Sequence, residues 1–186
     1  MNPDKFWELI DQAREEAGGW EEMDSPLAEA LALLEMPDLM LWAQIFSEYQ
    51  RLSYKNKLWA AAYIINGGCS DDGFDYFRAW LTAQGREVFL AALADPDSLA
   101  DVDDCDGDVE YEDLLGVAAR AYFQKKGLQG RDYDQYYQEL EQYPLADETA
   151  AEMRFEIEYA ADIDVEWDED EGLEDLLPKL CEAFDW

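Results

Sequence analysis

"LWAAAYIINGGCSDDGFDYFRAWL", residues 58–81, decides the fold, because it contains two apolar segments joined by a short polar turn. Residues 58–65 are apolar at almost every position, which is typical of an element buried on most sides, and the alanines among them favour a helix. The segment from Ser70 to Gln84 then repeats large apolar side chains at helical spacing, namely Phe74, Phe77, Trp80 and Leu81. We therefore expect two core helices, the second ending at Gly85.

The turn between these helices, "NGGCSDDGF" at residues 66–74, has two interpretations. As a joint, its asparagine and glycines end one helix, its serine caps the next, and its aspartates favour the first turn of that helix. As a site, the region offers candidate ligand- or partner-binding residues, which are Cys69, Ser70, Asp71, Asp72 and Arg78. The joint explains more of these residues, because the chain contains no histidine that could activate the thiol.

Apolar residues recur at helical spacing over most of the remaining chain. Asn2-Pro3 and Ser25-Pro26 are predicted helix starts, and Pro178 is expected to stop or kink a last, leucine-rich helix. Further helices are expected from about residue 38 and over residues 86–94, 110–126 and 133–142. Because the connections are short, the sequence predicts a mainly α, single-domain helical bundle over residues 1–186.

Residues 153–167, "MRFEIEYAADIDVEW", depart from this pattern, because apolar side chains occupy every second position. That period predicts a strand or hairpin around 153–167. However, no other stretch offers an equally clear partner strand, an unpaired strand exposes its edge, and alanine pairs at 150–151 and 160–161 also allow a helix. Strand and helix both stay open for this segment.

The chain is very acidic, with 13 basic and 46 acidic residues and a net charge of -33. Residues 1–94 contain 16 acids and 7 bases, whereas residues 95–186 contain 30 acids and 6 bases, so the second half is the more acidic. This charge repels phosphate backbones and anionic lipids, and we expect no direct binding to nucleic acid or membranes. The expected partner is a basic protein, such as a toxin, a nuclease or a nucleic-acid-binding protein.

The acidic region from Asp162 to Asp175 and the alternating acids just before it form the candidate interaction surface. A strand there would display carboxylates largely on one face, in imitation of the closely spaced phosphates of DNA. The candidate residues of this surface are Glu156, Glu158, Asp162, Asp164 and Glu166. The alternative is a solvated surface that serves solubility or adaptation to high salt.

A second acidic stretch, "DVDDCDGDVEYED" at residues 101–113, resembles a calcium-binding loop. With Gly107 at the sixth place of such a loop, Val102 falls where the first ligand belongs and Asp113 replaces the closing glutamate, so the match fails. A weak, irregular divalent-cation site would use four carboxylates, those of Asp104, Asp106, Asp108 and Glu110. A solvated acidic loop is the simpler interpretation.

Several classes of protein lack their minimum residues in this sequence. There is no phosphate-loop, dinucleotide-binding or hydrolase-elbow motif, so we expect no cofactor. The three cysteines are far apart and odd in number, which disfavours a disulfide framework. The first residues have no basic segment followed by an apolar one, and no window approaches the length of a membrane span, so a cytoplasmic location is expected.

Residues Leu58 to Ala100 resemble a bacterial family of uncharacterised proteins, domain of unknown function 4240. Looser resemblance extends to "FWELI" near the start, to "EDLLGVAARAY" at residues 112–122, and to "WDEDEGLEDLLPKL" at residues 167–180. The resemblance implies a bacterial, cytoplasmic, single-domain protein, and it supplies no activity, substrate or catalytic residue.

Together these observations favour a non-enzymatic protein-interaction module that presents its acidic second half to a basic partner. The alternative is an enzyme or small-ligand binder with a pocket near Cys69–Arg78. A structural protein stabilised by a cation is a third class.

Overall fold

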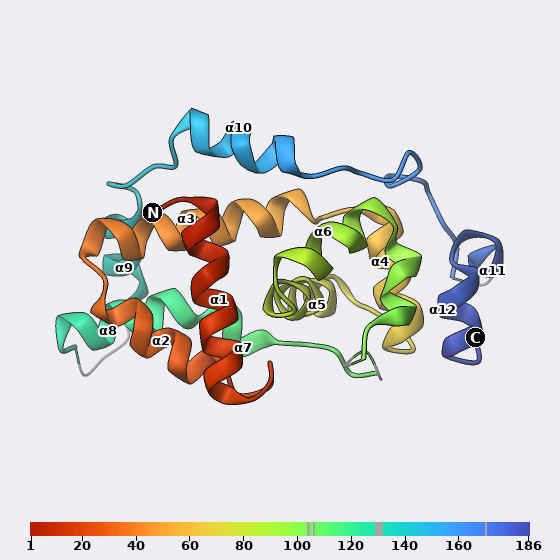
Figure 1. The fold of residues 1–186 in the computed structure, drawn as a ribbon, viewed down its shortest axis with the longest axis horizontal. Coiled ribbons are helices and arrows are strands. Elements are labelled where there is room, and N and C mark those ends of the chain that lie inside the picture. Colours follow the sequence, from red (N-terminus) through yellow and green to blue (C-terminus); the bar gives the residue numbers. More distant parts are fainter. Residues whose placement is uncertain (104, 106, 129–131, 170) are drawn as a thin grey trace. The chain divides into compact units, whose positions relative to one another are not determined.

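The computed structural model describes residues 1–103, 105, 107–128, 132–169 and 171–186, and the regular structure of these residues is helical (Figure 1). The mainly α prediction is confirmed. Contacts between Cα atoms group the chain into two compact units, one made of Met1–Tyr49 and Glu112–Arg154 and the other of Gln50–Tyr111 and Phe155–Trp186. The organisation as one domain stays a prediction. No helix in the described part of the chain combines the length and apolar character that a membrane crossing requires.

The first unit contains the N-terminal helices and those that follow residue 111. They are α1 (Pro3–Ala17), α2 (Asp24–Leu33), α3 (Met36–Leu52), α7 (Glu112–Leu115), α8 (Val117–Lys126), α9 (Tyr133–Leu140) and α10 (Asp147–Glu156), with the last residues of α3 and α10 assigned to the second unit. The Asn2 side chain caps α1 by accepting the N–H of Lys5 at 2.9 Å, as predicted. By contrast, α2 begins at Asp24, so Pro26 lies inside its first turn and Ser25 is not the cap.

An aromatic cluster forms the core between α1 and α3. The ring centroids of Phe6 and Trp42 are 5.0 Å apart in a stacked arrangement, and those of Trp42 and Phe46 are 5.5 Å apart. Trp7 donates its indole N–H to the hydroxyl of Tyr49 at 3.0 Å, which satisfies both polar groups inside the core. These rings lie on the apolar faces of α1 and α3. Helical spacing predicts such faces, and each apolar face needs a partner surface.

The second unit contains the helices of the opening stretch and the C-terminal segment. They are α4 (Asn56–Ile65), α5 (Asp71–Ala83), α6 (Arg86–Ala94), the 3₁₀-helix η1 (Pro96–Asp101), α11 (Leu173–Leu176) and α12 (Pro178–Ala183). α4 and α5 are each buried over most of their length, as residues 58–81 predict. The predicted interruption at Pro178 is also confirmed, because one residue separates α11 from α12.

The prediction of a strand or hairpin around 153–167 is wrong for the described residues, and a helix over the whole segment is wrong as well. Residues 153–156 end α10, and residues 157–167, which we call the strap, have no regular helix or strand. The strap buries Ile157 and Ile163 and bonds its backbone to helix ends instead of to a strand. The N–H of Ala160 donates to the carbonyl oxygen of Leu93 at 3.0 Å, and the N–H of Lys57 donates to that of Ile163 at 2.9 Å.

A buried aspartate joins η1 to the last helix. Asp97 accepts the N–H groups of Lys179 and Leu180 at 3.1 and 3.0 Å, which lie in the first turn of α12. A helix leaves its first N–H groups without partners, and here a side chain from a distant part of the sequence supplies them. Asp97 therefore acts as a long-range cap for α12.

We predict that Asp97→Ala lowers the free energy of unfolding by about 1–3 kcal/mol, because it leaves two N–H groups of α12 without acceptors. Equilibrium unfolding in urea measures this loss. Asp101→Asn is the matched control, since Asp101 lies in the same 3₁₀-helix but is exposed, and its carboxylate lies 3.5 Å from Nζ of the exposed Lys179 side chain. Equal stabilities of Asp97→Ala and the control would contradict the capping role.

Candidate functional site

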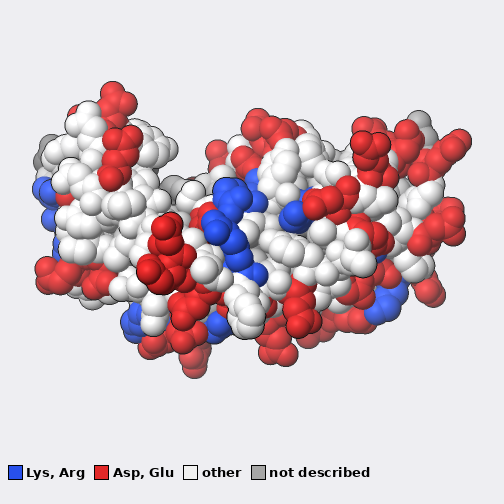
Figure 2. Space-filling model, turned by 90° about the horizontal axis from the view of Figure 1, so that it is seen from above, with Lys and Arg blue, Asp and Glu red and all other residues white. Residues whose placement is uncertain are grey.

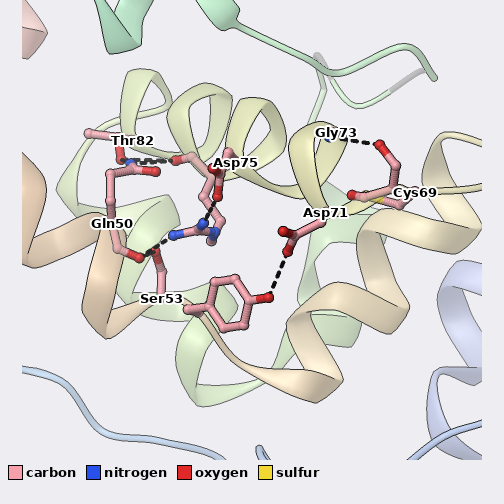
Figure 3. Close-up of polar contacts among 10 residues, drawn as sticks. Gln50, Ser53, Cys69, Asp71, Gly73, Asp75 and Thr82 are labelled. Carbon is pink, nitrogen blue, oxygen red and sulfur yellow. Dashed lines mark hydrogen bonds and ion pairs between the residues drawn. The ribbon is translucent and has the colours of Figure 1, made fainter.

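The turn between α4 and α5 is built as a joint between helices. Gly67 and Gly68 have φ values of 64° and 133°, conformations that L side chains rarely adopt. The N–H of Gly68 donates to the carbonyl oxygen of Tyr63 at 2.8 Å, which ends α4. Ser70 caps α5 by accepting the N–H of Gly73 at 3.0 Å (Figure 3). Asp71 and Asp72 follow in the first turn of α5 and are exposed, where the helix dipole favours them.

Arg78 lies on the buried side of α5 and not beside Cys69. Its guanidinium donates to the carbonyl oxygen of Gln50 and to the carboxylate of Asp75 (Figure 3). Its Cζ atom lies 4.8 Å from the ring centroid of Tyr54 and 4.9 Å from that of Phe74. Burial lowers the pKa of the Arg78 guanidinium, and the nearby Asp75 opposes that effect. These contacts tie the end of α3 to α5.

Tyr54 links this cluster to the start of α5. Its hydroxyl donates to the carboxylate of Asp71 at 2.8 Å, and this hydrogen bond is the main reason why the pKa of Tyr54 is raised (Figure 3). Of the five candidate residues of the opening stretch, Asp71 and Arg78 are thus brought together only through Tyr54. The structure does not assemble all five around one reacting point.

The Cys69 thiol is not activated. Burial is the largest cause that raises its pKa to about 11, and the carboxylate of Glu110 acts in the same direction. Trp59 and Arg78 lower the pKa by less. Since the thiolate is the nucleophilic form of cysteine, this environment opposes nucleophilic chemistry at neutral pH.

The candidate acidic surface divides into two groups. Three of its members form ion pairs inside the second unit. The Nε of Arg86 lies 3.0 Å from Oε2 of Glu156, Nζ of Lys57 lies 2.8 Å from Oδ2 of Asp162, and Nζ of Lys55 lies 2.8 Å from Oδ2 of Asp164. The hydrogen bond from Lys57 is the main cause of the lowered pKa of Asp162. Asp162 and Asp164 anchor the strap through these pairs although both carboxylates remain exposed, and Glu156 anchors the end of α10 just before it. Glu158 and Glu166 are also exposed to solvent.

The candidate cation loop is described only in part. Asp104 and Asp106 lie outside the described residues, Asp108 has a left-handed φ of 50°, and Glu110 is exposed. Among the residues that the structure describes, no group of three or more acidic or cysteine side chains is placed to hold a metal ion.

Two open cavities in the second unit share Glu166 and Trp167 in their linings. The first, of about 460 Å³, is lined by Asn56, Trp59, Tyr63, Cys69, Glu166, Trp167 and Glu169. The second, of about 560 Å³, is lined by Val165, Glu166, Trp167, Asp168, Glu171, Gly172, Asp175 and Leu176. We call the first the aromatic cavity and the two together the acidic groove.

The aromatic residues of the groove were not among the predicted site residues. Trp59 and Tyr63 are four residues apart on α4, and this spacing by itself predicts only two neighbours on one face of a helix. Both side chains are half-buried, as is Trp167 on the strap. The signal in the sequence is a single tryptophan, Trp167, among the acids at 166–169, but its meeting with α4 depends on contacts across more than 100 residues.

Residues 1–124 match the family described as "Protein of unknown function (DUF4240)". The chain belongs to the DUF4240 family. The matched residues of this DUF4240 chain include α4, α5 and Cys69, whereas the strap and Trp167 lie beyond them, as does the looser resemblance at residues 167–180. No curated protein and no solved structure matches the chain.

We predict that Arg78→Ala lowers the free energy of unfolding of the DUF4240 chain by about 2–4 kcal/mol, because it removes a buried side chain and leaves Asp75 and the Gln50 carbonyl without their donor. Asp72→Asn is the control, with an expected loss below about 1 kcal/mol, since Asp72 is exposed. Urea unfolding of both variants provides the measurement. A fully stable Arg78→Ala variant would contradict the structural role of Arg78.

We also predict that alkylation of Cys69 by iodoacetamide, in a Cys105→Ser/Cys181→Ser background, accelerates about tenfold per pH unit from pH 7 to pH 10. The pKa of about 11 keeps the thiolate fraction small and rising throughout this range. Mass spectrometry of the modified chain measures the rate, and circular dichroism confirms folding at each pH. A rate that levels off below pH 8 would show an activated thiol instead.

Proposed function

We propose that this chain is a non-enzymatic protein-interaction module that binds a basic protein partner through the acidic groove. The observation that carries the proposal is the lining of the groove. Among the described residues that line it are apolar side chains, Asn56 and five carboxylates, and none of these residues is basic. The acids are Glu166, Asp168, Glu169, Glu171 and Asp175. A hollow surface of one charge sign concentrates ligands of the opposite sign.

The surrounding sequence supports the same partner chemistry. Residues 157–186 contain twelve acidic residues, and Lys179 is the one basic residue in that segment. Figure 2 shows acidic side chains spread widely over the visible face and basic side chains gathered in a few places. A partner rich in arginine and lysine, such as a toxin, a nuclease or a nucleic-acid-binding protein, would be steered to this surface and held by charge-assisted hydrogen bonds.

The alternative function, a small-ligand binder or enzyme near Cys69–Arg78, retains one supporting observation, which is that Cys69 lines the aromatic cavity. The high pKa of that thiol supports ligand binding over catalysis within this alternative. A small ligand would bind without the steep dependence on ionic strength that a basic protein surface requires.

The test compares two triple variants that remove the same charge from different places. The groove variant is Glu166→Gln/Glu171→Gln/Asp175→Asn, and the matched control is Glu16→Gln/Glu21→Gln/Glu29→Gln, whose acids are exposed in the first unit. The probe is a fluorescein-labelled peptide of alternating basic and Gly-Ser segments, and fluorescence anisotropy gives its Kd at several salt concentrations.

We predict that the groove variant binds the peptide about tenfold more weakly than the wild type and that the control changes Kd less than about threefold, because net charge is equal and only position differs. The affinity of the wild type should fall steeply as salt rises. Equal losses in both variants would assign the binding to net charge alone and would refute the groove as the interaction surface.

A further inference from the structure

The aromatic cavity has rings that are held in place by the fold. The indole of Trp59 stacks on Phe74 with centroids 5.0 Å apart and an interplanar angle of 10°, and its N–H donates to the carbonyl oxygen of Cys69 at 3.0 Å. The rings of Tyr63 and Trp167 are 5.3 Å apart at 55°. Three aromatic side chains from α4 and the strap therefore line one space whose geometry exists before any ligand arrives.

The carboxylates of the cavity lie beside these rings. Glu169 accepts the hydroxyl of Tyr63 at 3.0 Å, which fixes the phenol and places a negative charge at its edge. Glu166 lines both halves of the acidic groove and is exposed. Aromatic faces attract cations through their quadrupole, and adjacent carboxylates add a full charge and hydrogen-bond acceptors.

We propose that the aromatic cavity is a specific receptor for the guanidinium of an arginine side chain on the basic partner, an inference that rests on the proposed function. A guanidinium is planar, stacks on indole and phenol faces, and donates in a fork to a carboxylate. The lysine ammonium is a strongly hydrated point charge and uses only part of this lining. The cavity volume of about 460 Å³ also leaves room for the apolar stem of the arginine.

The position of the cavity next to the second half of the groove gives the arginine a defined role. Trp167 and Glu166 belong to both cavities, so a chain whose arginine occupies the first continues along the carboxylates of the second. The arginine acts as an anchor among the aromatic rings, and the remaining basic residues of the partner add charge contacts along the carboxylates. Trp59, Tyr63 and Trp167 then determine the preference for arginine, and the carboxylates increase the association rate of the basic partner.

The experiment uses the full chain and two labelled peptides of equal charge, one with arginine and one with lysine at every basic position, together with N-acetylarginine amide as the free ligand. The wild type should bind the arginine peptide at least about threefold more tightly than the lysine peptide. Trp167→Leu should weaken the arginine peptide about 3- to 30-fold and remove the preference over lysine, because it keeps apolar bulk and deletes the aromatic face. Trp167→Phe should restore part of the preference.

The controls separate this site from general effects of the substitutions. Phe155→Leu makes the equivalent aromatic-to-leucine change at a side chain that is 92% exposed and outside the cavity, and it should leave both affinities within about twofold. Glu169→Gln is compared with Glu158→Gln, an equal charge change at an exposed residue of the same segment. The melting temperature of every variant is recorded, and if Trp167→Leu does not fold, the Glu169 pair and Trp167→Phe carry the test.

Each outcome decides one of the two proposals. Unchanged preference for arginine in Trp167→Leu, or equal affinities for both peptides in the wild type, overturns the arginine site while the salt-dependent binding to the groove stands. Absence of binding by both peptides overturns the proposed function. Binding of N-acetylarginine amide as tight as that of the arginine peptide, lost in Trp167→Leu, overturns the polypeptide source and assigns the cavity to a free guanidinium ligand.

Discussion

The anchoring of the strap to the first turn of α4 is the interaction on which the surface of the second unit depends. α4 begins without a side-chain cap, and lysines at positions 55 and 57 flank its N-terminus, where positive charge opposes the helix dipole. The strap supplies what is missing: the carbonyl oxygen of Ile163 accepts the N–H of Lys57, and Asp162 and Asp164 pair with the two lysines. A helix start that is poor by itself becomes a binding surface for a distant segment.

This anchoring also places the residues of the groove. Because residues 162–164 are fixed on the N-terminus of α4, residues 166–169 follow beside Trp59 and Tyr63 on the next turns of the same helix. Neither α4 nor the strap makes the aromatic cavity alone. α5 also helps to position the cavity. Its buried Phe74 stacks on the indole of Trp59 and also contacts the guanidinium of Arg78.

Local sequence rules predicted the parts of this structure that local forces determine. The cap at Asn2, the turn at Gly67-Gly68, the cap at Ser70 and the stop at Gly85 each follow from backbone preferences within a few residues. Alternation in residues 153–167 was misleading, because a period of two describes any extended segment with one buried side. Here the strap buries Ile157 and Ile163 against helices, and its hydrogen bonds go to helix ends.

The candidate site shows the same division between local and distant causes. The acidity of the second half was evident from composition, but the sequence could not separate acids that anchor the strap from acids that face solvent. Asp162 and Asp164 differ from Glu166 only through their lysine partners, which lie more than 100 residues earlier. Likewise, Cys69 and Arg78 looked like members of one site, yet Arg78 faces Gln50 and Tyr54 while Cys69 lines the aromatic cavity.

The mixture of aromatic rings and carboxylates in the groove favours some classes of cation over others as ligands. A small divalent cation needs several converging oxygen ligands, and aromatic faces supply none of them. An organic cation gains from both surfaces, because its apolar or planar body displaces water from the rings while its N–H groups meet the carboxylates. Net charge alone does not distinguish cations of equal charge, so discrimination between arginine and lysine has to come from the rings that α4 and the strap bring together.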